Sequence, residues 1–134
     1  MLFHKNSYLV TATLTFDDKA KRTTFNSSQQ VWQENDITLT NDKASSTNGV
    51  ADYVKPARFY ANSSITVSAN GEITTIIFDC NNSSYATALK NSIGSTATVS
   101  SDKVTVEVSG ADSFDIAKLT AQVRMDAITV TYWE

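Results

Sequence analysis

The feature that most constrains this chain is a two-residue alternation between apolar and polar side chains. Between Tyr8 and Phe16, the even positions from 10 onward are apolar, and threonine occupies positions 11, 13 and 15. Successive side chains of a β-strand point to opposite faces, so this pattern predicts a strand with one buried face. The segments 36–40, 64–68 and 103–109 repeat it with β-branched residues. The chain is therefore predicted to be mostly β-structure.

The segment Ile73–Cys80 is denser in apolar residues than the other strands. Such density predicts a central strand that is covered on both faces. Asn70-Gly71 precedes it, and this dipeptide is a strong signal for a tight turn. We therefore expect a hairpin between residues 65–69 and the central strand.

The last strand changes its alternation partway along. Val123 and Met125 follow one register, whereas Ile128 and the apolar residues after it follow the other. One extra residue near Asp126 or Ala127 would return both parts to the same face. The sequence thus predicts a β-bulge there.

A four-residue spacing interrupts the strands once. Tyr85, Leu89 and Ile93 recur at this interval after two serines that can cap a helix. We predict one short helix over residues 85–91.

The fold class follows from about nine short strands with turn signals between them. We predict an all-β, two-sheet antiparallel β-sandwich that is jelly-roll-like, with barrel closure as the alternative. Residues 1–7 are expected to form an N-terminal arm, and residues 8–134 a single domain, because one chain of this length buries one core.

Charge and hydropathy exclude some partners. The net charge is −3 and the basic residues are scattered, which argues against nucleic acid. No stretch approaches the ~20 apolar residues of a membrane span, and the start lacks the pattern of a signal peptide. If Met1 is the native start, we expect a protein that stays in the cell or is packed into a particle. The alternative is a piece trimmed from a larger secreted chain.

Residues for catalysis are sparse. His4 is the only histidine, and it lies in the polar arm. No nucleophile elbow, zinc-binding helix or phosphate loop is present, so we predict no enzymatic activity, no cofactor and no catalytic metal. A pair of carboxylates could still hydrolyse a glycoside. The single Cys80 ends an apolar run and is predicted to be a buried, unreactive thiol.

Three residues are candidates for ligand binding. Tyr53, Arg58 and Tyr60 combine aromatic rings with a bidentate donor, as a sugar platform or protein interface does. Arg58 and Tyr60 should share one strand face, opposite Phe59. Trp32 and Tyr85 are of the same type, but their apolar neighbours favour the core for both.

Two polar groups have ordinary structural explanations. The loop Asn41–Asp52 offers oxygen ligands for calcium, but its residues fit backbone-bonding turns better. Arg124 and Asp126 lie two apart on the last strand and are predicted to form an ion pair.

Several spaced segments together carry a resemblance. They are Val31-Trp32, Ile37–Ser46, Val50–Tyr53, Pro56–Tyr60, Cys80–Leu89 and Gln122–Asp126. With these, the chain resembles, over about residues 29–132, a poorly characterised β-sandwich module. That module occurs in surface and secreted proteins of gut bacteria and in phage proteins. The resemblance implies a jelly-roll-like, carbohydrate-binding-like fold without catalytic activity, and it transfers no ligand residues.

The leading hypothesis for the function is a non-enzymatic phage virion protein, a decoration or fibre-type subunit on the capsid or tail. Leu2, Phe3 and Trp133 would dock it onto capsid or tail proteins or onto copies of itself, because they are apolar residues with no evident place in the core. The alternative is a carbohydrate-binding module, extracellular or at the cell surface, that holds glycans with Tyr53, Arg58 and Tyr60.

Overall fold

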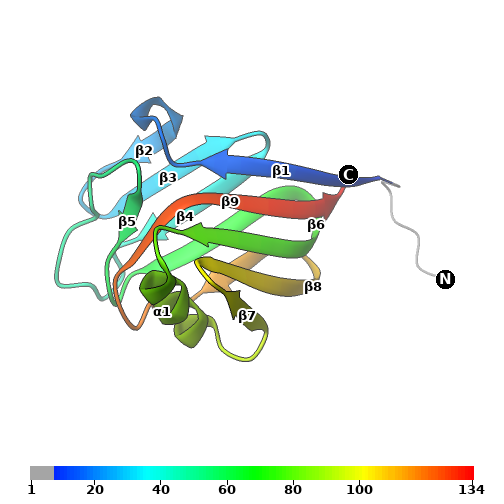
Figure 1. The fold of residues 1–134 in the computed structure, drawn as a ribbon. Helices are drawn as coiled ribbons and strands as arrows, with labels where there is room; N and C mark the ends of the chain where they lie inside the picture. The colour runs from blue at the N-terminus through cyan, green and yellow to red at the C-terminus, as the bar shows by residue number, and fades with distance from the viewer. Residues whose placement is uncertain (1–7) are drawn as a thin grey trace.

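The computed structural model describes residues 8–134, which form an antiparallel β-sheet with one α-helix, α1 (Ser83–Ile93), and one short 3-10 helix, η1 (Lys19–Lys21). Figure 1 shows the sheet curling around the core, with α1 at one end. The strands in these residues are β1 (Leu9–Thr15), β2 (Arg22–Phe25), β3 (Gln29–Glu34), β4 (Ile37–Asp42), β5 (Ala57–Phe59), β6 (Ser64–Cys80), β7 (Ala97–Ser100), β8 (Lys103–Ile116) and β9 (Val123–Trp133).

The alternation predicted for the first strand is confirmed. Leu14 and Phe16 are fully buried, whereas Thr11 and Thr13 are exposed on the opposite face. The hydroxyls of these two threonines lie 3.0 Å from those of Thr131 and Thr129 on β9. Such cross-strand pairs stabilise a solvent-facing sheet surface.

The path of the sheet depends on two long strands, β6 and β8. Along one edge β6 pairs with β8 over almost its whole length, from Ile65 opposite Ile116 to Asp79 opposite Lys103. Along the other edge its first part pairs with β4 and its second part with β9. The bonded order β1-β9-β6-β4-β3-β2 is therefore continuous, and the sheet curls into a half-barrel.

The structure has one curled sheet, so the prediction of two separate sheets is wrong. The predicted hairpin turn at Asn70-Gly71 is also wrong. Both residues lie inside β6, where the pairing with β8 shifts register between Ser68 and Ile73. The dipeptide occupies a bend in one strand rather than the end of a hairpin. Because β6 and β8 both continue through the bend, the two halves of the molecule remain one sheet.

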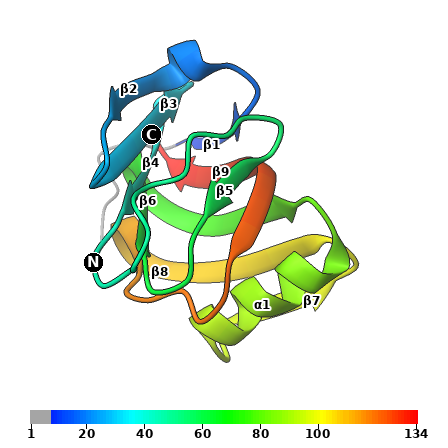
Figure 2. The ribbon, with the colours of Figure 1, turned by 90° about the vertical axis from the view of Figure 1, so that its left-hand side faces the viewer.

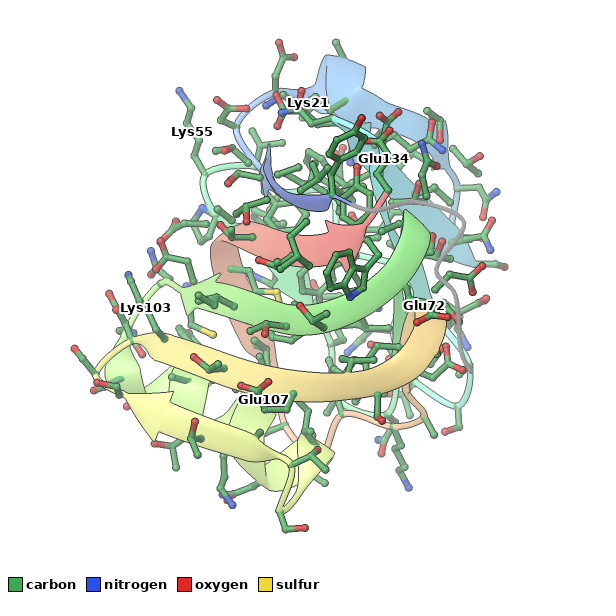
Figure 3. All side chains as sticks on the ribbon, turned by 90° about the vertical axis from the view of Figure 1, so that its right-hand side faces the viewer. Lys21, Lys55, Glu72, Lys103, Glu107 and Glu134 are labelled. Atoms are coloured by element: carbon green, nitrogen blue, oxygen red, sulfur yellow. The ribbon has the colours of Figure 1, made fainter. Side chains whose placement is uncertain are left out.

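The outer face of the long strands is polar. Lys103 reaches Asp79 across β8 and β6 at 3.2 Å, and Thr75 donates to Glu107 at 3.4 Å. Figure 3 shows Lys103 and Glu107 on β8 at the side turned toward the viewer. Ile73–Cys80 is central, as predicted, but Ile77 and its outward neighbours are only half-buried, so the strand is not covered on both faces.

The bulge predicted in the last strand is confirmed. Ala127 pairs with Asp79 and Met125 pairs with Cys80, which leaves Asp126 as the extra residue of β9. Its carbonyl accepts a hydrogen bond from the Phe16 N–H at 3.0 Å. The insertion keeps the apolar side chains on both sides of the bulge buried.

The helix is also confirmed, and it is longer than predicted. Its start is capped by Asn82, whose side-chain oxygen accepts from the Tyr85 N–H at 3.1 Å. Ala86 and Leu89 are fully buried and close one end of the core.

The buried apolar residues form one cluster in the curl of the sheet. The Phe16 ring meets Trp32 edge-on at 5.1 Å between centroids and Phe59 at 5.8 Å. This geometry is the one aromatic pairs favour. Trp32 is fully buried, so its predicted place in the core is confirmed.

Side chains complete the curl where β1 approaches the β3–β4 turn. Asn35 and Asp36 have positive φ angles of 54° and 66°, the conformation of a two-residue hairpin turn. From it, Asn35 donates to the Thr13 carbonyl at 3.0 Å, and Glu34 accepts from the Thr15 N–H at 2.9 Å. These two hydrogen bonds occupy backbone groups on the edge of β1 at its C-terminal end, at Thr13 and Thr15.

Replacement of Gly71 tests the bend. A Cβ at Gly71 would overlap the backbone oxygen of Trp133, whereas one at Gly49 would lie 3.3 Å from its nearest neighbour. We expect Gly71→Ala to lower the free energy of unfolding by about 3 kcal/mol or more, because backbone cannot move as a side chain can. The control Gly49→Ala should cost about 1 kcal/mol or less. Urea titration measures both, and equal losses would contradict the proposed close approach.

Candidate functional site

The three predicted ligand residues lie on or beside β5. Phe59 is fully buried while Arg58 and Tyr60 are half-buried, which fits the predicted placement on opposite faces. The guanidinium carbon of Arg58 lies 3.8 Å from the centroid of the Tyr53 ring, and Tyr53 is 44% exposed. Stacking at this distance is a cation–π contact. The structure thus brings Tyr53 and Arg58 together.

Two further residues extend this surface: Arg124, which the sequence analysis assigned to an ion pair, and Tyr85, for which it favoured the core. Arg124 on β9 is the register partner of Arg58 on β5. Directly opposed residues on antiparallel strands point to the same face, so the two arginine side chains are neighbours. Arg124 lies 5.3 Å from the centroid of Tyr85, at the start of α1. Figure 2 shows β5 beside the start of β9, with α1 below them.

We call this surface the tyrosine–arginine face; it consists of Tyr53, Arg58, Tyr60, Tyr85 and Arg124. Tyr85 is half-buried against the core, so its predicted core position is confirmed only in part. The signal that could have found Arg124 is the pairing of β5 with β9. Such pairing between distant segments does not show in a single sequence.

A buried hydrogen-bond chain holds β5, which has only three residues. Gln30 donates to the Arg58 carbonyl at 3.4 Å and to the side chain of Asn41 at 3.0 Å. Asn41 donates in turn to the Ser63 hydroxyl at 3.0 Å, and that hydroxyl donates to the Tyr60 carbonyl at 2.6 Å. The backbone on both sides of Phe59 is therefore fixed from within the core.

Neither arginine of the face is neutralised by an acid. Among the described residues, no carboxylate lies within 4.0 Å of the Arg58 or Arg124 nitrogens, and the buried Nε atom of each has no acceptor. The predicted Arg124–Asp126 ion pair is therefore wrong. Asp126 is the bulged residue of β9, and the Arg124 guanidinium lies beside the Tyr85 ring instead, 5.3 Å from its centroid.

Arg22 shows the contrasting arrangement. Its guanidinium lies 4.1 Å from the Phe25 ring centroid, and its Nη1 atom is 2.8 Å from the Asp52 carboxylate. The hydrogen bond from Arg22 lowers the pKa of Asp52 below its usual value. The acid that immediately precedes Tyr53 is thus already paired with Arg22.

The predicted polar loop at 41–52 starts later than expected, because Asn41 and Asp42 belong to β4. Asn41 is 1% exposed, and its amide is used by the buried chain. Within residues 8–134, His, Cys, Asp and Glu side chains nowhere gather in a group of three that could hold a metal ion. The turn explanation fits Ser46, whose hydroxyl accepts from the Asn48 N–H at 3.2 Å.

One of the two carboxylates that line a hollow, Glu34, is also paired, whereas the other, Asp36, forms no ion pair with a described residue. A polar hollow of about 260 Å³ is lined by residues of the β3–β4 turn and Asn70, and Glu34 is one of them. Burial alone would raise the pKa of Glu34, but hydrogen bonds from Lys21 and the Thr15 N–H outweigh it and lower that pKa. Lys21 also pairs with Asp17 at 2.6 Å. A carboxylate held ionised in this way is a poor general acid.

Leu2 and Phe3, which were predicted to dock onto a partner, and the single histidine His4 lie outside the described residues. Trp133 is half-buried at the end of β9 and is the register partner of Leu9 on β1. The two side chains therefore share one face of the sheet, at the opposite end of β9 from Arg124.

No protein-family model matches the chain, and neither a curated protein nor a solved structure does. The resemblance to a bacterial and phage β-sandwich module stays a prediction. In the described part of the chain, no helix has both the length and the apolar character needed to cross a membrane.

Cys80 provides a test of nucleophile chemistry near the face. It is fully buried, and burial raises the pKa of its thiol to about 12. We expect its reaction with Ellman's reagent near pH ~8.5 to be at least about a hundredfold slower in the native protein than in urea, because the thiolate is the reactive form. A fast reaction in the absence of urea would contradict the burial.

Proposed function

We propose that this chain is a non-enzymatic binding module that holds carbohydrate on the tyrosine–arginine face. The observation that carries the proposal is the stack of Arg58 on the exposed Tyr53 ring at 3.8 Å. Aromatic rings bind the apolar faces of sugars, and guanidinium groups donate to their oxygens. A face whose backbone is fixed from within needs little reordering when a ligand arrives.

The chemistry around the face supports binding rather than catalysis. Asp52 is held by Arg22, and the thiol of Cys80 is buried with a raised pKa. Glycoside hydrolysis needs one carboxyl group that stays protonated near neutral pH. Asp17, Glu34 and Asp52 all have pKa values lowered by their cationic partners, which is the opposite shift.

Removal of the tyrosine rings tests the carbohydrate proposal. We expect Tyr53→Ala and Tyr60→Ala each to weaken binding on a glycan array by about tenfold or more, because a stacking ring contributes about 1.5 kcal/mol. The control is Tyr8→Ala, since Tyr8 is 71% exposed and lies at the far end of β9. Binding that survives both substitutions would contradict the placement of the site, and an array without any binding would remove the proposal.

A second candidate function is that of a phage virion structural subunit, a decoration or fibre-type protein of the capsid or tail. The observation that favours it is the open edge of β1. The backbones of Tyr8 and Phe16 form hydrogen bonds with the β9 side. Because these bonds alternate along an antiparallel strand, the backbone groups of Leu9 and Thr11 point away from β9. No described residue pairs with those groups. Leu9 is 53% exposed beside this edge. Exposed strand edges are surfaces for pairing with another chain.

The virion proposal commits to a second copy of this chain, added edge to edge along β1. We expect the protein to associate in sedimentation experiments, and Thr11→Pro to weaken this association by at least about tenfold, because proline removes an outward N–H. Leu9→Lys should act similarly, through charge at the edge. Lys118→Gln, which lies elsewhere, is the control. A wild-type chain that stays monomeric at high concentration would contradict edge pairing.

The location of the gene is a separate test of the virion proposal. Neighbouring capsid or tail genes would support it, and genes for polysaccharide breakdown would favour a cellular carbohydrate-binding module. A virion subunit that also binds sugars would satisfy both proposals.

A further inference from the structure

We infer that the ligand of the tyrosine–arginine face is an acidic sugar, whose carboxylate or sulfate is bound between Arg58 and Arg124. The inference rests on the proposed function and adds the chemical class of the ligand. It requires that the two guanidinium groups bind one ligand together, and the pairing of β5 with β9 supports this by placing Arg58 and Arg124 directly opposite one another.

The first argument is electrostatic. Like charges directly opposite one another on neighbouring strands repel and destabilise a sheet. Some other cations of the described chain sit beside acids, since Lys21 contacts Asp17 and Glu34 and Lys103 contacts Asp79. Exposed lysines such as Lys118 form no ion pair with a described residue, but none of them lies directly opposite another cation in the strand register. Arg58 and Arg124 have no such partner. An oxyanion placed between them would remove the repulsion.

The second argument concerns unsatisfied donors. The Nε atoms of Arg58 and Arg124 are buried and have no acceptor. Arg22 shares this feature, but its Nη1 atom already bonds Asp52 at 2.8 Å. A guanidinium donates to carboxylate or sulfate oxygens through paired, charge-assisted hydrogen bonds. The buried Nε atoms are beyond the reach of a ligand, but the Nη groups of both side chains also bond no described residue, and a ligand oxyanion would supply acceptors for them.

The third argument is the geometry of the flanking rings. Tyr53 lies against Arg58, and Tyr85 lies against Arg124. A stacked guanidinium keeps its plane and therefore loses less freedom when it binds an anion. The tyrosine rings leave aromatic surface beside the cations for the sugar ring. An acidic sugar presents both groups, since it carries an oxyanion on an apolar-faced ring.

Nucleic acid is a poorer fit to the same face. Phosphate-backbone binding draws on many cations, and this chain has a net charge of −3. A bare carboxylate on an acidic peptide would use the arginines but not the tyrosines. Acidic peptide is therefore included in the test as a competing outcome.

The experiment measures binding of the intact chain to paired ligands that differ only in charge. One pair is polygalacturonate and its methyl ester, and the other is dextran sulfate and dextran. We expect binding to at least one charged member and at least about tenfold weaker binding to its neutral partner. Carboxylate and sulfate are distinguished by which pair shows the difference.

The variants test whether the arginines carry that preference. We expect Arg58→Gln and Arg124→Gln each to weaken binding of the charged ligand by about tenfold or more. Arg58→Lys should also weaken it, because lysine keeps the charge but lacks the planar fork. Lys118→Gln removes the same unit of charge at an exposed position outside the face and should leave binding unchanged. Near-native circular dichroism of each variant excludes loss through unfolding.

Each other outcome overturns a defined part of the argument. Equal binding of charged and neutral members, unaffected by the arginine substitutions, overturns the acidic-sugar inference but leaves the carbohydrate proposal in place. No binding to any polysaccharide or array glycan overturns both. Binding of poly-glutamate as tight as that of either acidic polysaccharide overturns the inference in favour of a carboxylate-binding peptide surface. An equal effect of Lys118→Gln would show attraction to the whole surface rather than to this site.

Discussion

The structure depends on the pairing of β6 with β8 through a bend that only a glycine permits. At Gly71 the backbone of β6 passes directly beside the carbonyl of Trp133. On one side of the bend β6 pairs with β4, and on the other side it pairs with β9. The bend therefore decides which strands face each other across the core. It also brings the aromatic rings of Phe16, Trp32 and Phe59, from three distant segments, into one cluster.

The tyrosine–arginine face follows from the same arrangement. The strand β5 has too few residues to be stable alone, and it is held by pairing with β9 and by the buried chain from Gln30 to Ser63. The polar members of that chain are almost fully buried, so their hydrogen bonds are strong and their loss would be costly. The core thereby fixes the position of Arg58 relative to Arg124, although both side chains reach the surface.

Local sequence signals predicted the local structure well. The threonine alternation gave β1, the four-residue spacing gave α1, and the phase change gave the bulge at Asp126. Each of these depends on neighbours within about ten residues. The predicted turn at Asn70-Gly71 failed because the dipeptide reports only that a small residue and an unusual backbone are tolerated. What the glycine accommodates there is the backbone of Trp133, which lies far away in the sequence.

The candidate site was predicted in part for the same reason. Tyr53, Arg58 and Tyr60 lie close together in the sequence, and their residue types alone suggested binding. Arg124 was assigned to an ion pair with Asp126, because two-residue spacing normally places two side chains on one face. The guanidinium of Arg124 instead lies beside Tyr85, which is distant in the sequence. The cross-strand partner of Arg58 depends on a long-range pairing, which no local pattern contains.

The two candidate surfaces lie near opposite ends of β9, because the open part of the β1 edge pairs with the end of that strand. Arg124 lies near the start of β9 and Trp133 at its end, so at about 3.3 Å per residue they are about 30 Å apart along the strand. This length exceeds the Debye length of about 8 Å at physiological ionic strength, so charge at one end has little effect at the other. A ligand at the arginines and a second chain at the β1 edge can therefore be bound at the same time. The separation is what a subunit needs if it is anchored at one end and binds sugars at the other.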